Sequence, residues 1–97
     1  MVVGGALHVD AAKARRLLRE ILASGILTFS GHAKNEMAKD NLTEVDVRNT
    51  LKGGRPQAGE FENRSWRYGI LTSKIGVVIA FRAETWAVVV TAWRIGK

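Results

Sequence analysis

The sequence predicts an α+β domain in which amino-terminal helices pack on a carboxy-terminal sheet of four antiparallel strands. Two observations carry this prediction. In the first half of the chain, apolar residues recur at helical spacing behind good capping residues. In the second half, they gather in short β-branched and aromatic runs separated by turns. We expect one domain, 1–97, with residues 1–9 flexible, 10–53 helical and 57–94 in the sheet.

The first helix is expected between Asp10, a good N-cap, and Gly25, a good stop. Its apolar stripe consists of Ala14, Leu17, Leu18, Ile21 and Leu22. The basic residues on its flanks, Arg15, Arg16 and Arg19, are either a solvated face or a contact for RNA. Residues 26–29 then form a short extended link to a second helix, roughly 31–40, which Ser30 can cap.

The third helix is expected over residues 44–52. Thr43 and Asp46 at its start resemble a capping box with Asp in place of the usual Glu. Val47 and Leu51 should be buried, with Val45 as a third candidate. Two consecutive glycines then stop the helix.

Four strands should follow in an antiparallel meander, at about 57–63, 65–73, 75–82 and 86–94. Short turn segments separate the last three, which is typical of hairpins. The last two strands are almost continuously apolar, a pattern usual for strands that are buried on both faces. Three short helices can readily cover only one face. A partner or a second copy of the chain could cover the other.

The charge of the chain favours an anionic partner. The net charge is +6, and it is uneven: residues 1–54 carry eight basic and six acidic side chains, whereas residues 55–97 carry seven and three. Such an excess in a small domain indicates nucleic acid or an acidic protein as partner. Ordinary solubility charge is the alternative.

Several classes of site and location are not expected. The chain has no cysteine, which excludes disulfides and thiolate metal sites, and no spacing of histidine and glutamate suggests zinc. We therefore predict no metal and no cofactor. No apolar run is long enough for a membrane span, and the first residues lack the features of a signal peptide. We expect a cytoplasmic protein without a membrane partner.

The order of the elements and several short motifs resemble two related groups. The motifs His32-Ala33, Met37, Asp46-Val47 and Gly54 resemble a widespread bacterial family of small uncharacterised domains with a His-Ala, Arg-Met, Asp-Val and Gly pattern. From about residue 10 to residue 95, the chain is also similar to MqsR-type toxins of toxin–antitoxin systems. That similarity includes Leu18 to Gly25 and the closing strand from Val88 to Arg94. Both groups belong to the RelE-like ribonuclease fold.

The resemblance implies a metal-independent endoribonuclease that cleaves messenger RNA and is silenced by a cognate antitoxin. Toxins of the MqsR type use a lysine after the third helix, a glutamine and a tyrosine in the sheet, and a lysine on the last strand. Lys52 or Arg55 stands at the first position, Gln57 near the second and Arg94 at the last. The tyrosine position falls in an apolar strand here, so Tyr68, the only tyrosine, becomes the candidate.

His32 is the candidate proton-transfer residue. Cleavage of RNA by its own 2′-hydroxyl needs a base, an acid for the leaving 5′-oxygen, and cations near the phosphorane. Imidazole suits the first two tasks because its ordinary pKa lies close to neutral pH. The start of a helix favours the neutral form, which could serve as a base. The alternative is that His32 only caps or packs the helix start.

The arginines near the strand ends are candidates for phosphate binding, since guanidinium can donate two parallel hydrogen bonds to phosphate oxygens. Adjacent strands of a meander end at opposite edges, so Arg82 and Arg94 should not serve one phosphate. Arg94 should instead lie close to Lys74, with Arg67 or Lys74 completing its site. Strand alternation places Arg67 and Tyr68 on opposite faces. The same alternation puts Arg94 in one row with Trp86, Val88, Val90 and Ala92.

The predicted catalytic residues are thus His32, Arg94, Arg67 and Tyr68. The residues expected to contact RNA are Lys52, Arg55, Lys74, Arg82 and Trp66. We expect Trp66 to be exposed because a turn precedes it, and it could stack on a base. The alternative functions are a non-catalytic module of the same fold that binds RNA or protein, and a small structural homodimer.

Overall fold

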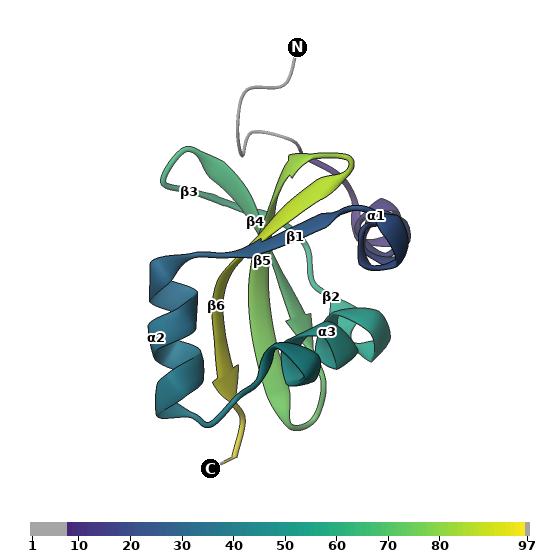
Figure 1. Ribbon diagram of the computed structural model, residues 1–97. Coiled ribbons are helices and arrows are strands. Elements are labelled where there is room, and N and C mark those ends of the chain that lie inside the picture. Colours follow the sequence, from purple (N-terminus) through teal and green to yellow (C-terminus); the bar gives the residue numbers. More distant parts are fainter. Residues whose placement is uncertain (1–7, 97) are drawn as a thin grey trace.

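The computed structural model describes residues 8–96, which form three helices and a six-stranded sheet (Figure 1). The helices are α1 (Ala11–Ser24), α2 (Gly31–Lys39) and α3 (Glu44–Gly53). The strands are β1 (Ile26–Phe29), β2 (Arg55–Pro56), β3 (Glu60–Glu62), β4 (Ser65–Leu71), β5 (Ile75–Ala83) and β6 (Trp86–Arg94). The α+β class and the three helices are as predicted.

Each helix begins at the capping residue that the sequence indicates. The Asp10 carboxylate accepts a hydrogen bond from the backbone N–H of Lys13, and the Ser30 hydroxyl accepts one from Ala33. In α3, Thr43 and Asp46 form a complete capping box. The hydrogen bonds from Thr43 hold the pKa of Asp46 below its ordinary value.

Not every apolar residue of α3 belongs to its buried face. Val47 and Leu51 are buried, as predicted. Val45, the third candidate, is 64% exposed and points away from the core. It lies two residues before Val47, and positions two apart on a helix do not share a face.

The sheet is mixed, and the prediction of four antiparallel strands is wrong in two respects. The first concerns residues 26–29, which are a strand rather than a link. This strand, β1, pairs in parallel with β6, so that the strand order is β1-β6-β5-β4-β2. The pairing connects segments about sixty residues apart and leaves no local turn signal for sequence reasoning to find.

The second difference lies in the predicted strand 57–63, which is divided into β2 and β3. Both pair with β4, but Pro56 lies opposite Ile70 whereas Glu60 lies opposite Arg67. The chain between them therefore carries one residue more than β4 does, and the regular ladder is interrupted. Gly59 sits in this interruption against the ring of Tyr68, where a Cβ would come within 2.7 Å of the ring.

Two bulges bend the long hairpin of β5 and β6. Val78 pairs with Thr91 and Ile79 with Val89, so Val90 is an extra residue in β6. Arg82 is likewise extra in β5. Bulges increase the local twist and reverse the alternation of side chains beyond them. The expected row that joins Arg94 to the start of β6 is therefore broken at Val90.

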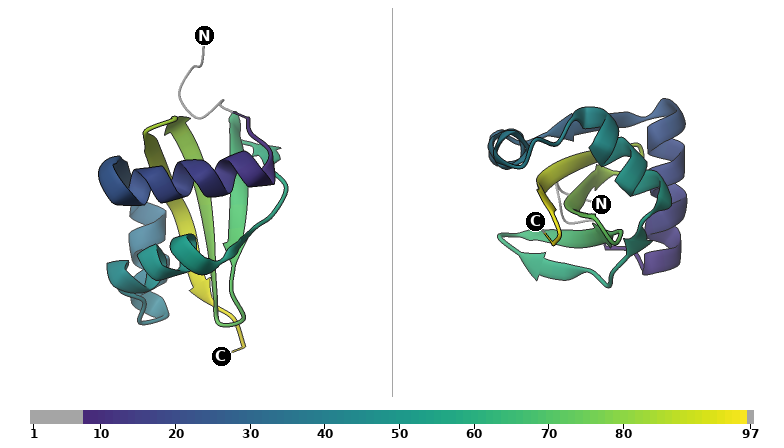
Figure 2. Two further views of the ribbon diagram at one scale, coloured as in Figure 1. Left: turned by 90° about the vertical axis from the view of Figure 1, so that its right-hand side faces the viewer. Right: turned by 90° about the horizontal axis from the view of Figure 1, so that it is seen from below.

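The three helices lie along one side of the curved sheet, which is clearest in the view from below (Figure 2, right). The core between the layers includes Leu17, Leu18, Ile21, Met37, Val47, Tyr68, Ile70, Val77, Ile79, Phe81 and Val89. Within residues 8–96, no helix covers the other side of the sheet. This open face is where a ligand can approach the strands directly.

The first described residues join this core. Residues 1–7 of the segment expected to be flexible lie outside the described part, but Val9 is only 5% exposed. Its backbone N–H donates a 2.7 Å hydrogen bond to the hydroxyl of Tyr68. Tyr68 itself is fully buried, and burial raises the pKa of its hydroxyl. The tyrosine therefore ties the segment before α1 to β4.

Replacing Tyr68 with phenylalanine tests this tie. The Tyr68→Phe variant would leave the buried N–H of Val9 without its acceptor, which typically costs about 1–3 kcal/mol. We expect the free energy of unfolding, measured by urea denaturation, to fall by that amount. A Ser73→Ala variant, which removes an exposed hydroxyl from the β4–β5 turn, is the comparison and should leave stability nearly unchanged. Unchanged stability of Tyr68→Phe would contradict the structural role.

Candidate functional site

The open face of the sheet contains a hollow of about 390 Å³. Its floor comes from β4, β5 and β6, and one wall comes from the segment that connects β2 to β3. The lining residues are Gln57, Ala58, Glu60, Glu62, Arg67, Gly69, Leu71, Val78, Val90, Thr91 and Trp93. An apolar floor with a few polar groups around it is the usual composition of a ligand site.

Arg67 is the one cation among these lining residues. Its Nε donates to the hydroxyl of Ser65 at 3.4 Å, and one of its terminal nitrogens lies 3.8 Å from the Glu62 carboxylate. Glu60 is its direct partner across the β3–β4 ladder. These contacts are long, so the guanidinium retains donors for an anionic ligand. The guanidinium can donate to phosphate oxygens, and the carboxylates beside it are candidate proton acceptors that also oppose the approach of an anion.

Two glycines shape the floor of the hollow. The indole of Trp93 lies directly over Gly76, and a Cβ on Gly76 would collide with it. On β4, the side chain of Gln57 passes over Gly69, where a Cβ would be in ordinary contact at 3.7 Å. The glycines thus let an amide and an indole lie flat against the strands, where they could contact a base.

Arg94 does not belong to this hollow. Beyond the bulge at Val90 it turns toward the helices, where its Nε donates to the carbonyl of Asp40 at 2.9 Å. A terminal nitrogen donates to the carbonyl of Asn41 at 3.2 Å. Its backbone N–H donates to the Asp40 carboxylate. Arg94 therefore satisfies carbonyls at the carboxy-terminal end of α2, where a cation is favoured.

His32 lies at the other end of the same helix. It is exposed in the first turn of α2, while Ser30 provides the cap, so the interpretation of His32 as the capping residue is wrong. Asp40 is eight positions after His32, which corresponds to about 12 Å along a helix. Since Arg94 is bound at Asp40, the two residues do not meet at one phosphate. Neither residue lines the hollow.

Arg67 and Tyr68, the two predicted catalytic residues on β4, point to opposite faces of the sheet, as predicted. Arg67 faces the open side and Tyr68 the core, where it has no exposed surface. Trp66, which was expected to be exposed, is half-buried on the edge of the core. The centre of its ring lies 4.0 Å from that of His8, with the two planes tilted by 38°, and Phe61 meets it edge-on at 5.4 Å. A turn does precede Trp66, as predicted, but the side chain of Trp66 lies on the same face of β4 as Tyr68, the face that the helices cover.

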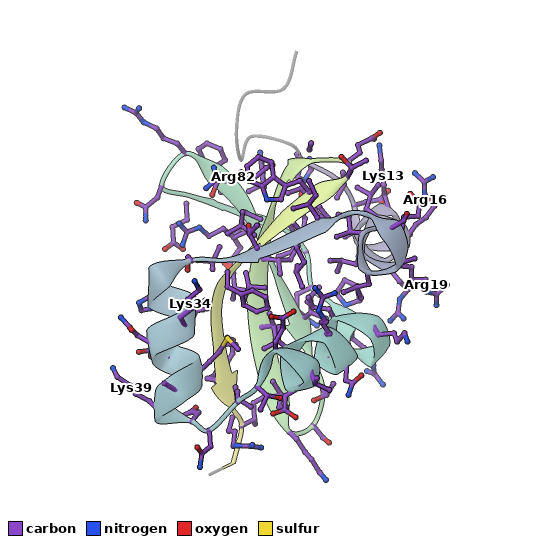
Figure 3. The ribbon with its side chains drawn as sticks, in the orientation of Figure 1. Lys13, Arg16, Arg19, Lys34, Lys39 and Arg82 are labelled. Atoms are coloured by element: carbon purple, nitrogen blue, oxygen red, sulfur yellow. The ribbon has the colours of Figure 1, made fainter. Side chains whose placement is uncertain are left out.

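The remaining predicted RNA contacts are dispersed. Lys74 lies near Arg94 as expected, because Ile75 pairs with Arg94 and the Lys74 carbonyl accepts from Ile95. Arg82 is exposed at the far end of β5 (Figure 3). Arg55 is exposed on β2, and Lys52 is in the last turn of α3 on the helix side. These cations surround the domain rather than marking one track.

Sequence reasoning missed most of the residues that line the hollow. Of these residues only Arg67 was a predicted site residue, Gln57 was a loose match to a toxin position, and Trp93 was one of three tryptophans that could stack on a base. Glu60, Glu62 and Thr91 were not selected. Their convergence depends on the β3–β4 register and on the Val90 bulge, which a single sequence does not reveal. The alternation of Glu60 and Glu62 across an expected strand was the one available signal. In residues 8–96 there is no cluster of three or more histidine, aspartate or glutamate side chains suited to a metal.

A known protein family matches the larger part of the chain. The sequence model of a family described as "Domain of unknown function (DUF4258)" matches residues 29–94. The chain belongs to this family. The matched region runs from the end of β1 to the end of β6, and so contains α2, α3 and the antiparallel strands. Searches of curated proteins and of solved structures found no match.

Membership confirms the coarser part of the expected resemblance, that the chain belongs to a family of uncharacterised domains, and does not test the His-Ala, Arg-Met, Asp-Val and Gly pattern. No match supports the similarity to MqsR-type toxins. The helices within residues 8–96 are too short or too polar to cross a membrane.

The helix-capping role of Arg94 can be tested by stability. Arg94→Ala removes two charge-assisted hydrogen bonds to carbonyls, and bonds of this kind contribute about 1.5–3 kcal/mol when buried. Because Arg94 is partly exposed, we expect a loss of about 1–2 kcal/mol in the free energy of unfolding. Lys74→Ala removes a neighbouring exposed cation and should leave stability nearly unchanged. Equal stability of the two variants would argue against the capping role.

Proposed function

We propose that this protein is a toxin-type endoribonuclease that binds messenger RNA on the open face of its sheet and acts in the cytoplasm. The observation that carries the proposal is the hollow around Arg67. It joins a partly free guanidinium to two carboxylates, with the Trp93 indole on the same face. The net charge of +6 would draw RNA toward the domain over a longer range.

In this proposal, Arg67 binds the scissile phosphate and stabilises the charge that develops on its oxygens. Glu60 or Glu62 accepts the proton of the 2′-hydroxyl, whose oxygen then bonds to phosphorus. The bond from phosphorus to the 5′-oxygen breaks, and that oxygen takes a proton from water. The products are a 2′,3′-cyclic phosphate and a free 5′-hydroxyl. Trp93 supports a neighbouring base by stacking.

One observation favours the alternative of a non-catalytic RNA-binding module. Among the residues that line the hollow there is no histidine, lysine or tyrosine that could protonate the leaving oxygen. Binding needs only Arg67, the indole and the surrounding cations. The two functions differ in whether the RNA is cut, and one series of variants can separate them.

The test is incubation of the pure protein with end-labelled single-stranded RNA in the presence of a chelator. The wild-type protein should produce fragments that end in cyclic phosphate. Arg67→Ala should lower the cleavage rate by on the order of a hundredfold to a thousandfold, since it removes a donor to the transition state. Glu60→Gln and Glu62→Gln, made singly, should identify the base, whose loss costs on the order of a hundredfold or more.

Lys34→Ala is the matched control, because it removes one exposed cation from α2 (Figure 3), and Lys34 is not among the residues that line the hollow. His32→Ala should also retain activity if the hollow is the site, whereas a large loss would restore His32 as the base. RNA binding without cleavage, weakened by Arg67→Ala, would establish the binding module instead. Neither binding nor cleavage by wild-type protein would refute both functions.

A further inference from the structure

A second depression lies on the helix side of the molecule, between α1 and α3. Its volume is about 390 Å³. The lining residues are Arg19, Leu22, Ala23, Val45, Arg48, Asn49 and Lys52. We call it the α1–α3 groove. None of its residues lines the hollow around Arg67, although Lys52 was one of the predicted RNA contacts.

The floor of the α1–α3 groove is apolar and crosses from one helix to the other. Leu22 and Ala23 contribute from the end of α1, and Val45 contributes from the first turn of α3. A single exposed apolar side chain is ordinary on a protein surface. Here, however, Val45 at 64% exposure continues a surface that Leu22 and Ala23 begin. Such a floor can receive a few apolar side chains of a partner.

The rim of the groove is basic. Arg19, Arg48 and Lys52 lie around the floor, and no carboxylate is among the lining residues. Figure 3 shows Arg19 extending from α1 on the side where α3 lies. The carboxylate of Glu44 is 2.9 Å from Arg48 and offsets part of that charge. Arg19 and Lys52 are exposed, and neither has an ion pair with another residue of the described range 8–96. A partner that fills this groove must therefore carry negative charge around its apolar contacts.

The groove is also held in a fixed shape, which favours binding. A terminal nitrogen of Arg15 on α1 donates a 3.0 Å hydrogen bond to the carbonyl of Gly54, at the end of α3. Buried residues of both helices, among them Leu18 and Val47, anchor them to one core. A preformed site loses little conformational freedom when a ligand binds.

We propose that the α1–α3 groove binds an acidic amphipathic peptide segment of a partner protein, whose apolar side chains enter the floor while its carboxylates meet the rim. An amphipathic helix laid in a groove is a common mode of recognition. RNA fits the groove less well. Nucleic acid binds through cations together with stacking aromatic rings, and no aromatic side chain lines this groove. The proposal does not depend on ribonuclease activity.

The experiment uses a fluorescein-labelled peptide of about 14 residues, long enough for several helical turns. It carries leucines at i, i+4 and i+7 and glutamates on both flanks. Fluorescence anisotropy should show saturable binding to the full chain that weakens with added salt. The same peptide with lysine in place of glutamate, and a scrambled acidic peptide, should bind at least about tenfold more weakly, which corresponds to the loss of a few exposed ion pairs and apolar contacts.

Two variants locate the site. Val45→Asp places a carboxylate in the apolar floor, and the double change Arg19→Glu with Lys52→Glu reverses the rim. Each should reduce affinity by about tenfold or more. The matched control is Lys34→Glu with Lys39→Glu, which makes the same change of charge on α2 (Figure 3). All four positions are exposed, as is Val45, so thermal melting should show folded protein throughout.

Binding lost in the floor and rim variants but kept in the α2 control would support the proposal. Equal loss in rim and control variants would overturn it, because net charge alone would then explain binding. Competition by single-stranded RNA that Val45→Asp and the rim variant abolish would assign the groove to nucleic acid instead. Sedimentation showing a dimer that Val45→Asp dissociates would assign it to a second copy of the chain. No binding of the acidic peptide would also overturn the proposal.

Discussion

The parallel pairing of β1 with β6 is the constraint on which the rest of the structure depends. It fixes Ile26 opposite Trp86 and Phe29 opposite Val89, so that the end of α1 and the start of α2 are both attached to the last strand. The approach is close at Gly25, where a Cβ would lie 2.7 Å from the carbonyl of Thr85. Once both helices are held there, α3 fills the remaining helical layer against β4 and β5. The result is one covered face and one open face (Figure 2).

The bulges decide which side chains reach each face. Without the extra residue at Val90, alternation would carry Arg94 to the same side as Val88, near the hollow. With it, Arg94 turns to the helices and binds the end of α2, where it also contributes to the lowered pKa of Asp46. A single inserted residue thus turns a candidate for phosphate binding into a group that joins two helices and a strand.

Local signals in the sequence were sufficient for the helices, because caps such as Asp10, Ser30 and Thr43 act within three residues of themselves. The hairpins of β4, β5 and β6 were also accessible, since each has its own turn. The parallel strand β1 was not, because its partner lies about sixty residues away. The candidate site shows the same contrast between local signals and long-range pairing. Arg67 and Tyr68 could be assigned to opposite faces by alternation, but the convergence of Arg67 with Glu62 and Thr91 depends on registers that only the folded chain establishes.

The two proposed binding surfaces lie on opposite sides of one core. The hollow uses side chains that the open face of the sheet presents, and the α1–α3 groove uses the outer surfaces of two helices. No residue is shared between them, so a peptide in the groove would not exclude RNA from the hollow by direct overlap. Peptide binding in the groove could affect RNA binding in the hollow only through long-range electrostatics, which salt screens over about 10 Å at moderate concentration. An acidic peptide that neutralises Arg19 and Lys52 would lower the long-range attraction of the domain for RNA and leave the contacts of Arg67 unchanged. A partner bound in this way would slow the capture of RNA without blocking the site, and its effect would diminish as salt is raised.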